Sequence, residues 1–289
     1  MKKVILIAFI SIFTYGISIA QTAGDYKSNG TVDLSSSTNW QYYNGSTWVT
    51  AGSAPSNAVS GNTITILNGN TWNNQTGSLT LVSGVTLIHQ GTTGTFTSGY
   101  TITVNGTYVH NTTSLSSTIL GNITWGTNSN MIYRGSSSLT PAVYFEGNSF
   151  QNLSFESTSG NWGSTISGTT ATSCLDFTVG SGVTLTTTFT GMLTVNGNYT
   201  VNGTITYSTG TQKITFIGFN KTVGGTGGIS FENVTFNPGS AYTLNSNMTL
   251  SATFTHTVSG TLTTANLAVI TSNGHLTLAN SGNIIFGTG

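Results

Sequence analysis

Charged residues are scarce in this sequence. Only 4% of its 289 residues are Asp, Glu, Lys or Arg, against about 25% in an average globular protein. Six basic and six acidic residues give a formal net charge of zero. A protein that binds nucleic acid through its phosphates needs a clustered basic face, so the composition excludes a nucleic-acid partner. Groups for acid–base catalysis are equally few.

Cysteine and long apolar runs are also missing. The sole cysteine, Cys174, has no partner for an internal disulfide, so packing and hydrogen bonds must stabilise the fold. It stands beside Leu175, and we expect it to be a small buried hydrophobe. Beyond the N-terminal segment no apolar run approaches the roughly 20 residues that a membrane-spanning helix needs. We therefore expect no membrane span.

The N-terminal segment 1–20 has the features of an export signal. Lys2 and Lys3 precede an apolar stretch at 4–13, and small residues stand at Ser18 and Ala20. This pattern predicts a signal peptide over 1–20, cleaved before Gln21. We expect the mature protein to be exported, either secreted or on the outer cell surface.

Alternation of apolar and hydroxylated residues with a period of two recurs from Thr63 onward, and no stretch shows helical spacing. Val, Ile and Leu of each run are expected to face the core, and Thr, Ser and Asn to face solvent. The chain has 37 glycines, many between the runs in turn pairs such as Ser83-Gly84 and Ser181-Gly182. The sequence predicts an all-β protein.

Short strands in long succession, separated by glycine turns, favour a right-handed parallel β-solenoid, with a β-sandwich as the alternative. We expect an N-terminal cap over 21–70 and solenoid repeats over 71–289, in about 11 coils at roughly 20 residues each. The cap is expected to protect strand edges that would otherwise aggregate.

Internal similarity supports a repeat. The segment 131–135 is followed by Phe-Gln-Asn-Leu-Ser-Phe at 150–155, and the segment 214–218 is followed by Phe-Glu-Asn-Val-Thr-Phe at 231–236. In both pairs the two segments follow in the same order, and their aromatic residues stand at corresponding positions. A third opening, Ile-Ile-Phe-Gly at 284–287, stands just before the end of the sequence. We therefore expect the sequence to be truncated inside a repeat array.

The opening segment Gly24-Asp25-Tyr26, the following tryptophan-rich stretch, Pro55 and the first alternating strand resemble the start of large secreted repeat proteins of Bacteroidota. The Phe-x-Asn-Leu/Val-x-Phe pattern resembles the repeats of that family. The resemblance implies a secreted or cell-surface solenoid that uses type IX secretion, often adhesin-like. Such proteins usually end in a C-terminal sorting domain, which this sequence does not contain.

Glu146 and Glu156 are the candidate catalytic residues. Glycoside hydrolysis needs two carboxylates about 5 to 10 Å apart, and these two could meet across neighbouring coils. In the internal alignment, however, Gln151 corresponds to Glu232 and Glu156 to Asn237, so carboxylates are not retained at these positions. We expect no enzyme activity. No histidine has another two or four positions away that could share a metal ion, so we predict no metal site and no cofactor.

The aromatic residues Trp40, Tyr43, Trp48 and Trp72 are the candidate ligand-binding residues, because flat rings flanked by Asn and Gln can stack on sugar faces. The alternative is that these rings are buried and cover the solenoid end. The hypothesis is an exported structural or adhesin-like β-solenoid, whose partners would be extracellular glycans or cell-surface components. The alternative is a polysaccharide-binding or polysaccharide-cleaving β-helix protein.

Overall fold

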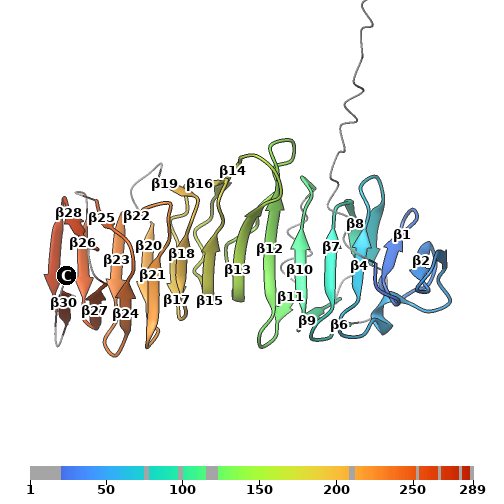
Figure 1. The fold of residues 1–289 in the computed structure, drawn as a ribbon, viewed down its shortest axis with the longest axis horizontal. Coiled ribbons are helices and arrows are strands. Elements are labelled where there is room, and N and C mark those ends of the chain that lie inside the picture. The colour runs from blue at the N-terminus through green and yellow to red at the C-terminus, as the bar shows by residue number, and fades with distance from the viewer. Residues whose placement is uncertain are drawn as a thin grey trace, which may run out of the picture.

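The computed structural model describes residues 21–74, 78–96, 100–114, 123–207, 212–251, 254–265, 268–279 and 282–286. These residues form β-strands and one short 3₁₀ helix. The strands stack side by side along the long axis of the molecule, from β1 and β2 at the blue end to β30 at the red end (Figure 1). The expected signal peptide over 1–20 lies outside the described residues.

Each turn of the chain contributes up to three strands, which stack on three faces of the solenoid. The first face contains β4 (Thr63–Ile66), β7 (Thr86–His89), β10 (Thr107–His110), β12 (Asn130–Gly135), the ends of β13 (Ser149–Ser157) and β15 (Thr172–Val179), β18 (Tyr199–Val201), β21 (Lys221–Gly224), β24 (Ala241–Leu244), β27 (Thr261–Thr264) and β30 (Asn283–Phe286).

The other two faces complete each coil. The second face contains β5 (Thr71–Asn74), β8 (Thr92–Phe96), β14 (Trp162–Ile166), β16 (Val183–Thr187), β19 (Thr204–Tyr207), β22 (Ile229–Phe231), β25 (Met248–Leu250) and β28 (Ile270–Ser272). The third face contains β6 (Leu79–Leu81), β9 (Ile102–Val104), β11 (Ile123–Trp125), the starts of β13 and β15, β17 (Met192–Val195), β20 (Lys213–Phe216), β23 (Asn233–Phe236), β26 (Thr255–Val258) and β29 (His275–Leu278).

The strands of all three faces pair in parallel with those of the neighbouring coils. One register line on the first face runs through Leu87, Tyr108, Met131, Leu153, Phe177, Tyr199, Val223, Leu244, Thr264 and Phe286. The predicted parallel β-solenoid is confirmed, and the sandwich alternative is not. Over 71–289, nine coil-to-coil steps link the first-face strands from β7 to β30, rather than the expected eleven coils, because an average coil is longer than the roughly 20 residues assumed.

Alternation along each strand decides which side chains enter the core. In β4, for example, Ile64 and Ile66 are fully buried whereas Thr63 and Thr65 are partly exposed. Glycines in the turns before strands adopt the positive φ that tight turns require, with φ of 79° at Gly84. The predicted inward phase of the aliphatic residues is confirmed.

Aromatic rings form a column inside the stack. The ring centroids are 5.3 Å apart for Tyr133 and Phe155, 5.8 Å for Phe155 and Phe177, and 5.0 Å for Phe177 and Tyr199. These separations approximate the strand spacing of about 4.8 Å, so rings from successive coils can stack face to face or edge to face. The solenoid is therefore filled by side chains and contains a continuous apolar core.

The N-terminal end has a different topology. There β1 (Tyr26–Ser28) pairs in parallel with β4 and antiparallel with β2 (Trp40–Tyr43), which pairs antiparallel with β3 (Trp48–Thr50). A 3₁₀ helix, η1 (Pro55–Asn57), leads toward β4. Since β4 already pairs in parallel with β7, solenoid pairing begins inside the 21–70 segment.

The internal sequence similarity does not reflect the structural period. The segment 131–135 forms β12 on the first face, whereas the matching segment 214–218 includes β20 on the third face. The two segments are therefore not separated by a whole number of coils. They resemble each other because both are inward-facing aromatic strands, and they occupy different positions in their coils.

Candidate functional site

Two of the four candidate ligand-binding rings are buried. Trp40 is the first residue of the antiparallel strand β2 and is buried in the core, where its indole N–H donates a hydrogen bond to the Asp33 carbonyl over 2.8 Å. The Trp72 ring lies edge-on to His89 at a centroid distance of 5.3 Å. Neither ring presents a face to solvent. The idea of a four-ring binding surface is therefore wrong for Trp40 and Trp72, which cover and fill the core instead.

Tyr43 and Trp48 remain at the surface. They are register partners in the antiparallel pair of β2 and β3, and both are partly exposed. Their ring centroids lie 5.3 Å apart with an interplanar angle of 52°. The short β2–β3 turn thus brings together the two sequence candidates that a ligand can reach.

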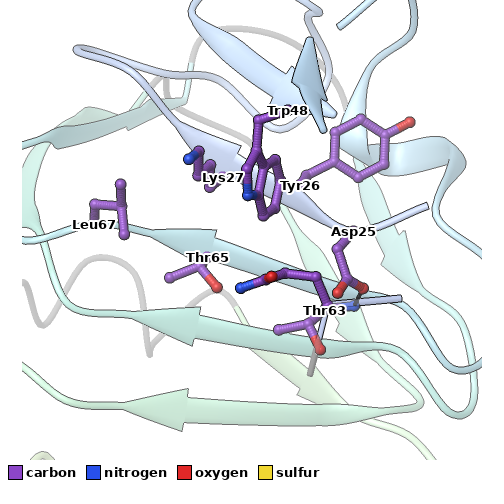
Figure 2. A pocket seen from close by; sticks show the side chains of 8 residues that line it. Asp25, Tyr26, Lys27, Trp48, Thr63, Thr65 and Leu67 are labelled. Atoms are coloured by element: carbon purple, nitrogen blue, oxygen red, sulfur yellow. Dashed lines mark hydrogen bonds between the residues drawn. The ribbon is translucent and has the colours of Figure 1, made fainter. Parts of the chain in front are cut away.

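Trp48 also lines a pocket of about 190 Å³ at the N-terminal end. Figure 2 shows its indole beside Lys27, with Asp25, Thr63 and Thr65 around it. The remaining lining residues are Gln21, Tyr26 and Leu67. Strands from the cap and from the first coil therefore build this pocket together.

Strand alternation explains why these polar groups share one side. In β1, Tyr26 and Ser28 are buried and Lys27 points the other way. Lys27 is the register partner of Thr65 in the parallel pair of β1 and β4, and Thr63 lies two positions before Thr65. Residues two apart on a strand face the same side. The β1–β4 pairing thus places one ammonium beside two hydroxyl-bearing side chains.

The two charged groups of the pocket have different environments. The Asp25 carboxylate accepts hydrogen bonds from the backbone N–H groups of Thr63 over 2.7 Å and Thr22 over 2.8 Å, and it is buried. The Lys27 ammonium lies 4.4 Å from the centroid of the Trp48 ring, a cation–π distance. Among the described residues Lys27 makes no ion pair. The Asp25 carboxylate is therefore engaged by two backbone N–H donors, whereas the Lys27 ammonium is available to a ligand.

The candidate carboxylates Glu146 and Glu156 are not brought together by the structure. Glu146 precedes β13 and Glu156 lies near the end of that strand. Hydrogen bonds from the backbone N–H groups of Thr169 and Thr170 lower the pKa of Glu146, the opposite of what a general acid needs. Glu156 pairs with Arg134 over 2.8 Å. Each carboxylate thus has a structural partner of its own.

The buried titratable groups are packing elements. His89 and His110 flank the Tyr108 hydroxyl, with Nδ1 to Oη distances of 3.0 and 3.3 Å. Burial lowers the pKa of His89 to about 4 and, with the nearby His89, that of His110 to about 3. Cys174 is buried as predicted, and burial raises the pKa of its thiol. No group of three or more His, Cys, Asp or Glu within the described ranges could hold a metal ion.

Sequence reasoning identified Trp48 but missed Lys27, Asp25, Thr63 and Thr65. The period-two pattern of β1 does contain a signal, because it places Lys27 outward. Its proximity to Trp48 depends on the fold-back of β2 and β3 and on the β1–β4 pairing. Those contacts join segments that are distant in the sequence, which local patterns do not specify.

No family model, curated protein or solved structure matches this chain. In the described part of the chain, no helix has the length and apolar character needed to cross a membrane.

Proposed function

We propose that this protein is an exported structural or adhesin-like solenoid that presents a long, weakly charged surface outside the cell. The observation that carries the proposal is the continuous buried core through about nine parallel turns. Such a stack is stabilised along its whole length by the same contacts between neighbouring coils. It forms a spacer or an extended contact surface without needing a catalytic centre.

The outer surface suits that role. Threonine, serine and asparagine side chains occupy the outward phase of the strands, for example Thr184 and Thr186 in β16. These groups donate and accept hydrogen bonds without strong electrostatic selectivity. The sequence-based export signal and the Bacteroidota resemblance support a location outside the cell.

Localisation and attachment test this proposal in the producing cell. Antibody labelling and protease treatment of intact cells should detect the protein outside the membrane barrier. Deletion of its gene should reduce attachment of the cells to polysaccharide-coated surfaces, and re-expression should restore attachment. A cytoplasmic location, or attachment unchanged by the deletion, would contradict it.

A second candidate function, glycan binding, is favoured by the pocket beside Trp48. A partly exposed indole next to Thr63, Thr65 and the Gln21 amide offers an apolar face and polar groups in one place. Sugar rings need both. A glycan array with the purified protein should then show binding that Trp48→Ala weakens strongly. The matched control is Val49→Ala, because Val49 is exposed on the same strand and does not line the pocket.

The alternative function predicted from the sequence also includes polysaccharide cleavage. A reducing-sugar assay on the bound polysaccharide tests it, with Glu146→Gln as the diagnostic variant. Product formation that this substitution abolishes would make the protein an enzyme. We expect no product, because Glu146 is held as a carboxylate by two backbone N–H groups.

A further inference from the structure

The pocket beside Trp48 contains an ammonium group, that of Lys27, which forms no ion pair with a carboxylate of the described residues. Its lining includes one basic side chain, Lys27, and one acidic side chain, Asp25. The Asp25 carboxylate already accepts two backbone N–H hydrogen bonds, one at each of its oxygens, and is buried beneath the strands. Lys27 is partly exposed, and its ammonium is directed over the indole rather than toward Asp25. The Lys27 ammonium is therefore the charged group with which a ligand in this pocket can form an ion pair.

The position of the ammonium leaves it able to bind a ligand. A lysine ammonium has three N–H donors, and the contact with the Trp48 ring uses the ring face rather than a hydrogen-bond acceptor. A partly exposed ammonium binds a carboxylate more strongly than it binds a neutral hydroxyl, because the attraction between opposite charges adds to the hydrogen bond. The pocket chemistry therefore favours an anionic ligand.

The other lining groups restrict the kind of anion. Trp48 and Leu67 supply apolar surface, and Thr63 and Thr65 supply hydroxyls on the same side of β4. A compact inorganic anion has no use for an indole face. The pocket has a volume of about 190 Å³, which suits a ligand of the size of a single six-membered sugar ring.

We propose that this pocket binds one acidic sugar residue of the hexuronic acid class. The sugar carboxylate pairs with the Lys27 ammonium, the sugar ring packs against the part of the Trp48 indole that the ammonium leaves uncovered, and ring hydroxyls reach Thr63 and Thr65. This inference rests on the glycan-binding candidate above and gives it a ligand class. It is independent of the structural role of the solenoid.

A pair of matched ligands tests the charge requirement. Oligogalacturonate and its methyl-esterified form share the same sugar rings and differ in the carboxylate charge. We expect calorimetric titration of the purified protein to show that the acid binds at least tenfold more tightly than the ester. The affinity for the acid should fall as salt concentration rises, because salt screens the Lys27–carboxylate attraction.

Variants locate the site. Lys27→Met keeps an unbranched four-atom stem without the ammonium and should abolish the preference for the acid, whereas Lys27→Arg should preserve it. Trp48→Ala should weaken binding of both ligands. Lys221→Met is the matched control, because Lys221 lies on β21 far along the stack and does not line the pocket; it should leave both affinities unchanged.

The outcomes separate the two claims. Equal binding of acid and ester, with Trp48→Ala impaired, would overturn the acidic-sugar inference and leave glycan binding in place. Binding that survives both Lys27→Met and Trp48→Ala would place the site elsewhere and overturn the inference. No binding to the acid, the ester or any glycan on the array would overturn both. The ligand comparison uses the unaltered protein, so it stands even where a variant fails to fold.

Discussion

The N-terminal end of the solenoid and its last described coil differ in what covers the side chains that face the core. On the third face Val258 in β26 is 1% exposed, because β29 of the next coil lies over it, whereas Leu278 in β29 is 55% exposed. On the first face Thr264 is buried and its partner in the next coil, Phe286, is 70% exposed. Burial in this fold therefore comes from the neighbouring coil, and a strand sequence alone does not provide it.

The N-terminal end is covered in another way. Antiparallel strands and polar side chains take the place of a coil there. The Ser28 hydroxyl accepts a hydrogen bond from the Leu67 backbone N–H over 2.8 Å, and Asp25 accepts one from Thr63 over 2.7 Å. Short polar side chains thus satisfy backbone groups of the first coil. The same substitution should therefore change the free energy of unfolding by very different amounts in an interior coil and in the last described coil.

The largest difference is expected between Phe216 and Phe286. Phe216 is 0% exposed and its ring contacts those of Tyr199, Phe236 and Tyr242. Phe216→Ala should lower the free energy of unfolding by about 3–5 kcal/mol. Phe286→Ala, at 70% exposure, should change it by less than about 0.5 kcal/mol. Urea denaturation measures both, and similar effects would contradict the described burial.

The closure of the N-terminal end depends on Asp25. Asp25→Ala removes a charged acceptor from two backbone N–H groups, which should cost about 1.5–3 kcal/mol locally. Hydrogen exchange should accelerate in β1 and β4 and stay unchanged in β20. Ser46→Ala in an exposed turn is the control. Uniform acceleration along the whole stack would show that the cap and the coils unfold as one unit.

Much of this fold follows from the sequence, because a solenoid repeats one local pattern. The inward phase of Ile64, the turn at Gly84 and the buried phase of His89 all come from alternation and glycine placement. The coil length does not, since turns of variable length separate the strands. The pocket is the least predictable part. It depends on Trp48 folding back toward Lys27, and no local pattern specifies that contact.

Acid should weaken the interior around His89 and His110, which contact Trp72, Tyr108 and Tyr133. Both histidines are neutral when folded, with pKa values of about 4 and about 3, while the histidines of the unfolded chain protonate near pH 6.5. The unfolded state thus binds more protons below that pH, so stability falls as pH drops from about 6.5 toward 4.

The slope of this pH dependence is measurable. It should reach about 1.4 kcal/mol per pH unit for each histidine. Urea denaturation between pH 7 and pH 4.5 should show it, and His89→Phe should reduce the slope. His275→Gln is the control, because His275 is exposed on the last described coil. An unchanged slope in His89→Phe would show that this histidine is not kept neutral by the fold.

The smallest effect is expected at the ion pair of Arg134 and Glu156. Their side chains are 25% and 40% exposed, so solvent screens the attraction. Glu156→Gln should cost about 0.2–1 kcal/mol, and the cost should shrink at high salt. Lys213→Gln at an exposed position provides the comparison. A loss above about 2 kcal/mol would mean that this pair contributes far more than a surface ion pair.

Distances along one face test the parallel stack most directly. Thr65, Ser154 and Thr200 occupy one register line, with Ser154 four coils and Thr200 six coils from Thr65. Spin labels on cysteines at 65 and 154, and at 65 and 200, in a Cys174→Ser background should give backbone separations of about 19 and about 29 Å at about 4.8 Å per coil. Separations that do not increase from the first pair to the second would contradict the solenoid.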